Sequence, residues 1–162
     1  MTTTSTDKIT RQLLRTIERR SFCTLATSSP AHRAHVAGVL YATVGSTLYV
    51  STLRGSRKAR NVAANPNVGV CIPVRRLPVG PPSSVQFQAV ADVLAQDDPR
   101  LLRLVEDGAL SAITKHGELT VPDGCFLRIT PARTVFTYGV GMPLLTFLRD
   151  PLNAAGSVTL SA

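Results

Sequence analysis

The residues best suited to chemistry lie in one short basic segment, residues 51–61, which read STLRGSRKARN. Four of these residues are cations and none is an acid. Ser56 is a favourable N-cap, and residues 59–64 favour a helix that the following Asn-Pro pair ends. The pattern predicts that Arg57 and Lys58 occupy the first turn of a helix, where the helix dipole disfavours positive side chains.

Two interpretations of this helix start remain open from the residues alone. In the first, an anion occupies the site, so that free backbone N–H groups, the dipole, an arginine fork and an ammonium converge on one phosphate. In the second, a solvated run of charges caps a short helix and binds nothing. Both account for the same residues.

The elements around this segment predict a mainly β fold. A polar tail, residues 1–6, precedes a helix over 7–20, whose apolar positions fall on one face. Strands are expected at 22–28, 35–43, 47–52, 68–72, 85–94, 124–130 and 132–138. A helix starts at Asp98, and residues 109–117 fit a further short helix.

Consecutive strands joined by short turns, without strict strand–helix alternation, indicate an antiparallel barrel with flanking helices. The length fits one domain over 1–162, in which the segment 139–162 has no predicted structure. The apolar runs are much shorter than the ~18 residues that a spanning helix needs, so we expect no membrane segment. The N-terminus lacks the features of a secretory signal, so we expect a cytoplasmic protein.

The net charge of +8 raises the question of nucleic-acid binding. Base stacking usually needs aromatic side chains, yet the chain has no Trp and only 5% aromatic residues. We therefore expect a small anionic partner and no nucleic acid. Cys23, Cys71 and Cys125 form no C-x-x-C pair, which argues against a disulfide framework and a metal site and favours small buried side chains.

No residues with the pattern of a hydrolase site stand out. The chain shows neither a Ser-His-Asp arrangement nor paired carboxylates, and His116 lies at an expected helix end exposed to solvent. Catalytic residues therefore stay unassigned, and a bound cofactor would carry any reaction. Specificity would come from the loops 75–83 and 108–122 and from the C-terminal tail.

A longer pattern includes the basic segment. The residues TLAT at 24–27 lead through His35 and Val36 to a hairpin ending LYVST at 48–52, and then to SRKARN at 56–61 and NPNV at 65–68. This order resembles the pyridoxamine 5′-phosphate oxidase-like family of flavin-binding split-barrel proteins. The resemblance covers residues 8–138 and is strongest over 22–73. It implies a split β-barrel and a site at a homodimer interface.

The resemblance also implies which residues bind the cofactor. Those matching Arg57 and Lys58 hold its phosphate, and those matching Ser51 and Thr52 contact the phosphate or the ring region. The strand from Val36 through Gly38 to Leu40 lies against the ring. A polar residue of the fifth strand, matched by Ser84 or Gln86, touches the cofactor as well.

The implied activity is that of an oxidoreductase using FMN or the deazaflavin coenzyme F-420 on a small substrate. A non-catalytic flavin or haem carrier or sensor of the same fold is the alternative. Tyr41 and Ala42 stand where the true oxidase has a basic phosphate ligand late in the second strand. The C-terminal arginine- and histidine-bearing substrate signature is missing too. We therefore do not expect oxidation of pyridoxamine phosphate.

Overall fold

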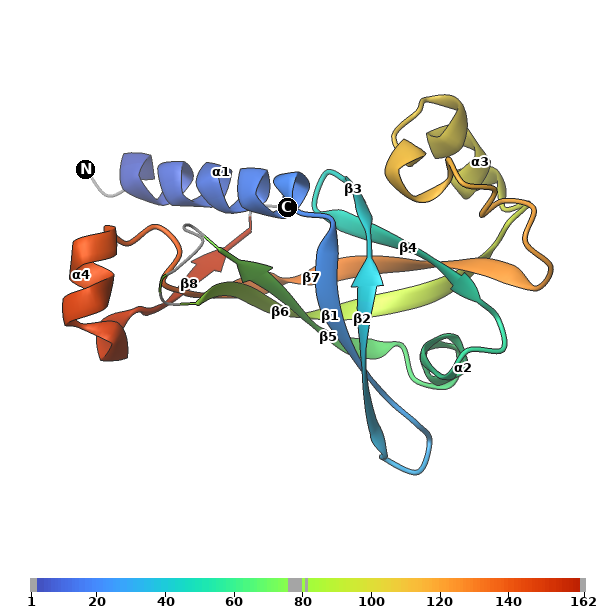
Figure 1. The fold of residues 1–162 in the computed structure, drawn as a ribbon, viewed down its shortest axis with the longest axis horizontal. Helices are drawn as coiled ribbons and strands as arrows, with labels where there is room; N and C mark the ends of the chain where they lie inside the picture. The colour runs from blue at the N-terminus through green and yellow to red at the C-terminus, as the bar shows by residue number, and fades with distance from the viewer. Residues whose placement is uncertain (1–2, 76–79, 81, 161–162) are drawn as a thin grey trace.

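The computed structural model describes residues 3–75, 80 and 82–160. Within them eight strands form one antiparallel sheet in the order β2-β1-β5-β6-β7-β4-β3, with β8 beside β7 (Figure 1). The strands are β1 (Phe22–Ser28), β2 (Ala34–Leu40), β3 (Ala42–Val44), β4 (Thr47–Leu53), β5 (Asn67–Val74), β6 (Ser83–Ala95), β7 (Gly124–Tyr138) and β8 (Ala155–Thr159). The helices are α1 (Thr3–Arg19), α2 (Arg57–Ala64), α3 (Pro99–Glu106) and α4 (Leu144–Arg149), with 3-10 turns η1 (Ser111–Ile113) and η2 (Pro151–Asn153).

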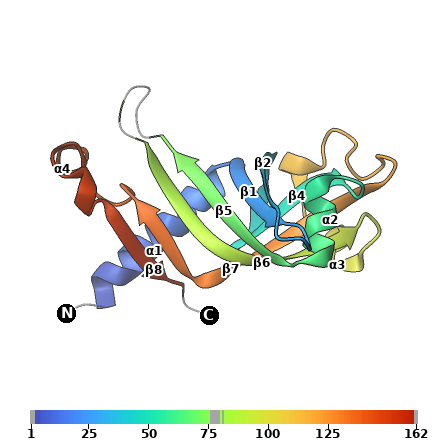
Figure 2. The same cartoon turned by 90° about the horizontal axis from the view of Figure 1, so that it is seen from below.

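The sheet curls into a barrel that stays open along one side. Figures 1 and 2 show the strands wrapping around a common interior, with α1 lying along one face. β2 and β4 come close together, but among the described residues no ladder joins them. The fold is therefore an antiparallel split barrel with flanking helices, which confirms the predicted fold class.

The longest strand, β7, holds the two parts of the sheet together. Its first half pairs with β4, its second half pairs with β8, and its opposite edge pairs with β6. A register shift falls opposite Gln88, where Phe87 faces Val135 but Ala89 faces Pro131. Two separate strands were expected here, at 124–130 and 132–138. They are one strand because a bulge tolerates a proline that has no N–H to donate.

The helix α1 closes the interior of the barrel. Leu13 and Ile17 are fully buried in the main apolar core. The Tyr41 hydroxyl donates a hydrogen bond to the Ile17 carbonyl (2.8 Å), and the Tyr41 N–H donates to the Ser21 carbonyl (2.8 Å). These bonds turn the chain at Tyr41, so the strand expected over 35–43 is divided into β2, which pairs with β1, and β3, which pairs with β4.

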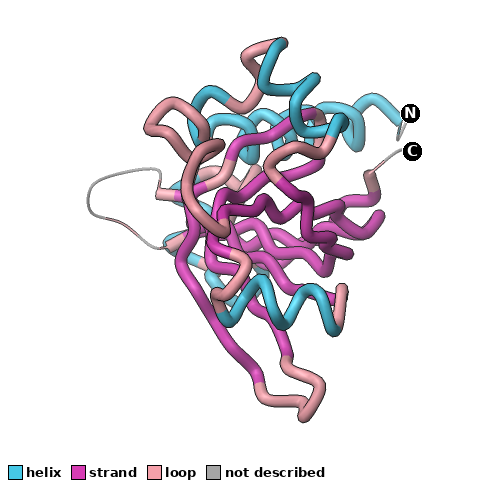
Figure 3. Tube along the Cα trace, turned by 90° about the vertical axis from the view of Figure 1, so that its right-hand side faces the viewer, coloured by secondary structure: helices cyan, strands magenta, loops and turns pink. Residues whose placement is uncertain are grey.

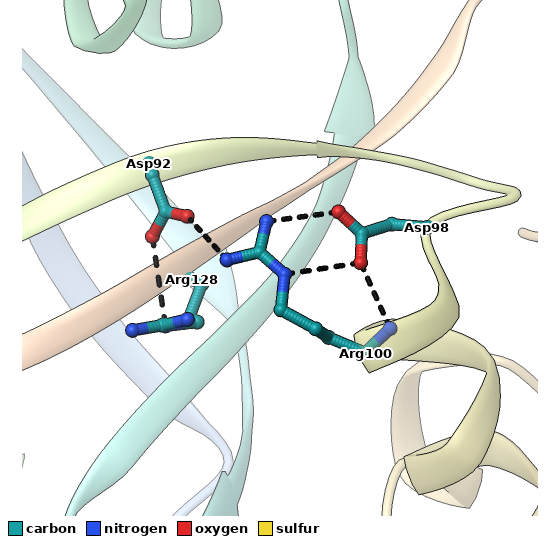
Figure 4. A network of polar contacts seen from close by, with 4 residues as sticks. All are labelled: Asp92, Asp98, Arg100 and Arg128. Atoms are coloured by element: carbon teal, nitrogen blue, oxygen red, sulfur yellow. Dashed lines mark hydrogen bonds and ion pairs between the residues drawn. The ribbon is translucent and has the colours of Figure 1, made fainter.

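A second apolar cluster packs α3 and η1 against strands β4 and β7 of the sheet. Leu101, Leu110 and Ile113 pack there against Tyr49 and Phe126 of the strands. Charged side chains support the same junction in Figure 4. There the Arg100 guanidinium donates to Asp98 (2.9 and 3.1 Å) and lies 3.6 Å from Asp92, which is also 3.6 Å from Arg128.

Several boundaries differ from the sequence prediction. α1 begins at Thr3, so most of the expected polar tail is helical, since neither Gly nor Pro stops the helix there; residues 1–2 lie outside the described residues. The short helix expected over 109–117 is only the 3-10 turn η1. The unassigned segment 139–162 forms α4, η2 and β8, because β7 extends far enough to offer β8 an open edge.

No helix within the described ranges is long and apolar enough to cross a membrane. Those ranges also hold no group of His, Cys, Asp or Glu side chains that could bind a metal ion. Cys23 and Cys125 are buried as predicted, whereas Cys71 is only half-buried.

Candidate functional site

The helix α2 begins where the sequence predicted. The Ser56 hydroxyl oxygen accepts a hydrogen bond from the Ala59 N–H (3.3 Å) and lies 3.2 Å from the Thr52 hydroxyl. Thr52 therefore supports the cap from the end of β4. Arg57 and Lys58 fall in the first turn, as expected, and no acid in that turn offsets their charge.

A cleft lies beside this helix start, where the barrel is split. We call it the α2 cleft. It has a volume of about 560 Å³, and its walls include Gly38 of β2, Ser51 of β4 and Lys58 of α2. Lys58 is half-buried, and within the described residues no ion pair joins it to an acid. The cleft thus combines a hydroxyl, an ammonium and the positive end of a helix dipole, which is a donor set for an anion.

The segment after η1 forms the opposite wall of the cleft. Lys115, His116 and Glu118 line it, although they are distant from α2 in the sequence. The Glu118 carboxylate accepts a hydrogen bond from the His116 N–H (2.8 Å). The pKa of Glu118 is lowered, first by a hydrogen bond from its own backbone N–H and to a smaller extent by the bond from His116. His116 is exposed as predicted, but no local pattern indicated that it lines the same cleft as Lys58. The only signal was that it lies in a loop expected to set specificity.

Arg57 faces the other side of α2. It lines a separate hollow of about 640 Å³, together with residues of the β1–β2 hairpin. The two neighbouring cations predicted to share one phosphate are therefore directed to two different cavities. They differ because side chains adjacent in a helix point about 100° apart around its axis.

Ser84 and Gln86 lie away from the α2 cleft. The Gln86 amide donates a hydrogen bond to the Ser84 hydroxyl (2.9 Å) on the outer face of β6. Gly38 faces Thr24, Thr24 faces Cys71, and Cys71 faces Gln86. Gly38 and Gln86 are thus three strand spacings apart, or roughly 14 Å. Within one chain the structure does not bring these two residues together.

The same outer face of the sheet is largely apolar and open. We call it the outer sheet face; its residues include Val36 and Leu40 of β2, Phe22 of β1 and Phe136 of β7. Their exposed fractions are 61%, 62%, 45% and 52% respectively. Val36, a predicted cofactor contact, therefore lies on an open surface next to the cleft. Exposed apolar patches of this kind commonly mark a protein interface.

The cysteines do not add a nucleophile. Burial raises the pKa of the Cys23 thiol to about 12 and also raises the pKa of Cys71 and Cys125. Because the thiolate is the reactive form, these thiols are poor nucleophiles at neutral pH.

The sequence matches the family described as pyridoxamine 5′-phosphate oxidase over residues 9–138. The fold is similar to that of HutZ, a haem storage protein from Vibrio cholerae, with a TM-score of 0.67 at 18% identity, covering 86% of this chain and 96% of that one. It is similar to a FAD-binding protein from Mesorhizobium loti, with a TM-score of 0.62 at 22% identity over 77% and 88% of the chains. It also resembles an F-420 reductase, with a TM-score of 0.51 at 18% identity over 73% and 91% of the chains.

No curated protein matches the sequence. At these identities the similarity to solved structures concerns the fold, and the names of the three proteins refer to three different cofactors.

Proposed function

The chain belongs to the pyridoxamine 5′-phosphate oxidase family, and we propose that it is an oxidoreductase that uses FMN or the deazaflavin coenzyme F-420 on a small substrate. The observation that carries this proposal is the position of Ser51 and Lys58 on one wall of the α2 cleft, at the start of a helix. When bound, the flavin or deazaflavin supplies the redox chemistry, and the chain supplies binding, orientation and electrostatics.

The residues of the cleft fit the phosphate end of such a cofactor. The Lys58 ammonium supplies a charge-assisted hydrogen bond, the Ser51 hydroxyl supplies a second donor, and the free N–H groups of α2 add the field of the helix dipole. Thr52 and Ser56 hold the cap in place through their 3.2 Å contact. A volume of about 560 Å³ lies in the ordinary range for small-molecule pockets.

We propose further that a second copy of the chain completes the site. Leu40 lines the α2 cleft and also belongs to the outer sheet face, where Val36 and Phe22 are exposed as well. A two-fold arrangement buries the same patch on both copies. It also offers a way for Ser84 or Gln86 of a partner to approach a cofactor that the same residues of its own chain do not reach.

The alternative function is that of a haem-binding carrier or sensor. His116 favours it, because this residue lines the cleft and an imidazole is a common axial ligand of haem iron. Tyr41 also lines the cleft, but its hydroxyl is used in the 2.8 Å bond to Ile17. His116 is therefore the residue on which the haem alternative depends.

Titration of the purified protein with FMN, F-420 and haemin, followed by absorbance, tests these functions. We expect saturable binding of FMN or F-420 that is weakened in Lys58→Ala and kept in His116→Ala. If haemin binds with a Soret shift that His116→Ala removes, and neither flavin binds, the haem alternative replaces the proposal.

Salt dependence separates the two flavin-type cofactors. The deazaflavin carries an acidic glutamate tail, and attraction between exposed charges is screened over about 10 Å at 0.1 M salt. We expect F-420 species with longer tails to bind more tightly at low salt, because the protein carries a net charge of +8. FMN affinity should change less with salt. Equal affinities for short and long tails at low salt would show that the basic surface does not contact the tail.

A further inference from the structure

A hollow beside the N-terminal helix α1 collects positive charge. We call it the α1 hollow, and its volume is about 650 Å³. Val74 of β5 lines it together with six polar side chains of the α1 segment, which are Arg11, Gln12, Arg15, Thr16, Arg19 and Arg20. Among the described residues that line it there is no acid. Figures 1 and 3 show α1 lying outside the strands.

Three of these arginines follow the helix at intervals of four residues. Arg11, Arg15 and Arg19 therefore lie in one stripe along α1, and all three are exposed. Like charges four residues apart destabilise a helix. The helix dipole favours Arg19 and Arg20 at the C-terminal end, but its effect does not extend to Arg15, which is more than one turn from that end. The dipole therefore does not account for the whole stripe.

The backbone that carries the stripe is held firmly by the barrel. Leu13 and Ile17, on the opposite face of α1, are fully buried, and the Ile17 carbonyl accepts the 2.8 Å hydrogen bond from the Tyr41 hydroxyl. The Arg20 guanidinium donates to the Arg75 carbonyl (3.1 Å), which holds Arg20 beside the end of β5. Because packing already orders this backbone, a ligand of the hollow would not have to order it.

Three of the four arginines lack a carboxylate partner in the described chain. Within residues 3–75, 80 and 82–160, no ion pair joins the side chains of Arg15, Arg19 or Arg20 to an acid. Guanidinium groups around one cavity repel each other, and an anion between them would relieve that repulsion. Guanidinium groups also favour planar, bidentate contacts with phosphate and carboxylate.

We propose that the α1 hollow is a binding site, separate from the α2 cleft, for a small ligand that carries two or more anionic groups. Guanidinium groups one helical turn apart, or roughly 6 Å along the axis, match several anionic groups better than one. A volume of about 650 Å³ lies in the ordinary range for small-molecule pockets, which favours a small ligand over a flat membrane surface. The described lining has no aromatic side chain for base stacking. Phosphate and carboxylate groups share the chemistry that this hollow recognises.

The test is a calorimetric titration at low salt with two probes, inorganic tripolyphosphate and citrate. We compare the wild type with Arg15→Gln/Arg19→Gln, because glutamine keeps the helix propensity of arginine and removes its charge. The control is Arg103→Gln/Arg149→Gln, which removes the same charge from the last turns of α3 and α4, outside the hollow. Circular dichroism and thermal unfolding check that each variant folds.

A second variant, Gln12→Glu, leaves every arginine in place. It adds a carboxylate to the wall of the hollow, where it should pair with the arginines and compete with the ligand. This variant changes the net charge by one, whereas the control changes it by two. A larger loss of affinity in Gln12→Glu than in the control would therefore be an effect of the hollow and not of net charge.

We expect at least one probe to bind the wild type and the control alike, and to bind both hollow variants more weakly by about tenfold or more. The probe that binds more tightly identifies the ligand as a phosphate or a carboxylate. An equal loss in the control would overturn the proposal, since net charge would then explain binding. Unchanged binding in the hollow variants, or no binding of either probe to the wild type, would overturn it as well.

The FMN affinity of the same variants distinguishes this proposal from the proposed function. It should stay at the wild-type value, because none of the described residues of the α1 hollow lines the α2 cleft. A parallel loss of FMN and probe affinity would make the hollow part of the cofactor site and refute a separate site. Probe binding without any flavin binding would support the α1 hollow and refute the proposed function.

Discussion

Replacing each of the two adjacent cations of α2 in turn tests whether the α2 cleft holds the cofactor phosphate. Lys58 lines the cleft and is half-buried, whereas Arg57 is exposed and lines the separate hollow on the other side of α2. A charge-assisted hydrogen bond contributes about 1.5–3 kcal/mol. Lys58→Ala should therefore weaken FMN or F-420 binding by about 10- to 150-fold.

Arg57→Ala is the matched control, since it removes the same charge one residue away. An exposed charge contributes about 1 kcal/mol or less after solvent screening, so binding should fall by roughly fivefold at most. The double variant should lose little more than Lys58→Ala alone.

The fold should tolerate both substitutions. Positive side chains at a helix start oppose the dipole, and removing one should raise the free energy of unfolding by about 0.3–1 kcal/mol. The buried Ala59 and Val62 and the bond from Asn61 to Thr27 keep α2 in place. Calorimetric titration at fixed ionic strength gives the affinities, and thermal unfolding gives the stabilities. Wild-type affinity in Lys58→Ala would place the phosphate elsewhere. Equal losses of affinity in both single variants would refute the inference that only Lys58 of the two cations contacts the cofactor phosphate.

Three further predictions concern the interface, the C-terminal segment and α3. Val36→Asp should give a monomer in sedimentation velocity with weaker cofactor binding, because it puts a charge on the outer sheet face; an unchanged dimer would contradict the shared site. Gly139 has a φ of +68°, and a Cβ there would lie 2.7 Å from the Phe147 ring. G139A should therefore lower the free energy of unfolding by more than G141A. The control G141A has backbone strain of about 1–2 kcal/mol and no steric contact. The Arg100 side chain, through its hydrogen bond, lowers the pKa of Asp98 to about 2. The ionised Asp98 carboxylate therefore stabilises the folded protein fully above the ordinary pKa of an aspartate, and this stabilisation is lost as the pH falls toward 2. In R100Q, carboxyl NMR should show this pKa returning toward its ordinary value.

The fit between sequence and structure is best where local chemistry decides. Ser56 caps α2 where its hydroxyl can accept from the third residue on, and Asp98 caps α3 by accepting from the Arg100 N–H at 2.8 Å. Strand positions followed from apolar alternation, as in β6, where Val85, Phe87 and Ala89 are buried. The ends of the strands were predicted less accurately. They depend on the hydrogen bonds from Tyr41 to distant carbonyls and on the bulge opposite Gln88, and both involve partners far along the chain.

The sequence by itself determined that Arg57 and Lys58 begin a helix, since capping and the dipole act within a few residues of the chain. Only the tertiary structure decided which side of α2 each cation faces, because that depends on how the helix packs against β1, β2 and β6. The same holds for His116, brought to the cleft by the burial of Ile113 in the second apolar cluster. It holds too for Gln86, which strand order places roughly 14 Å from Gly38. Such distances are set by pairing between segments remote in the chain, and a local pattern carries no record of them.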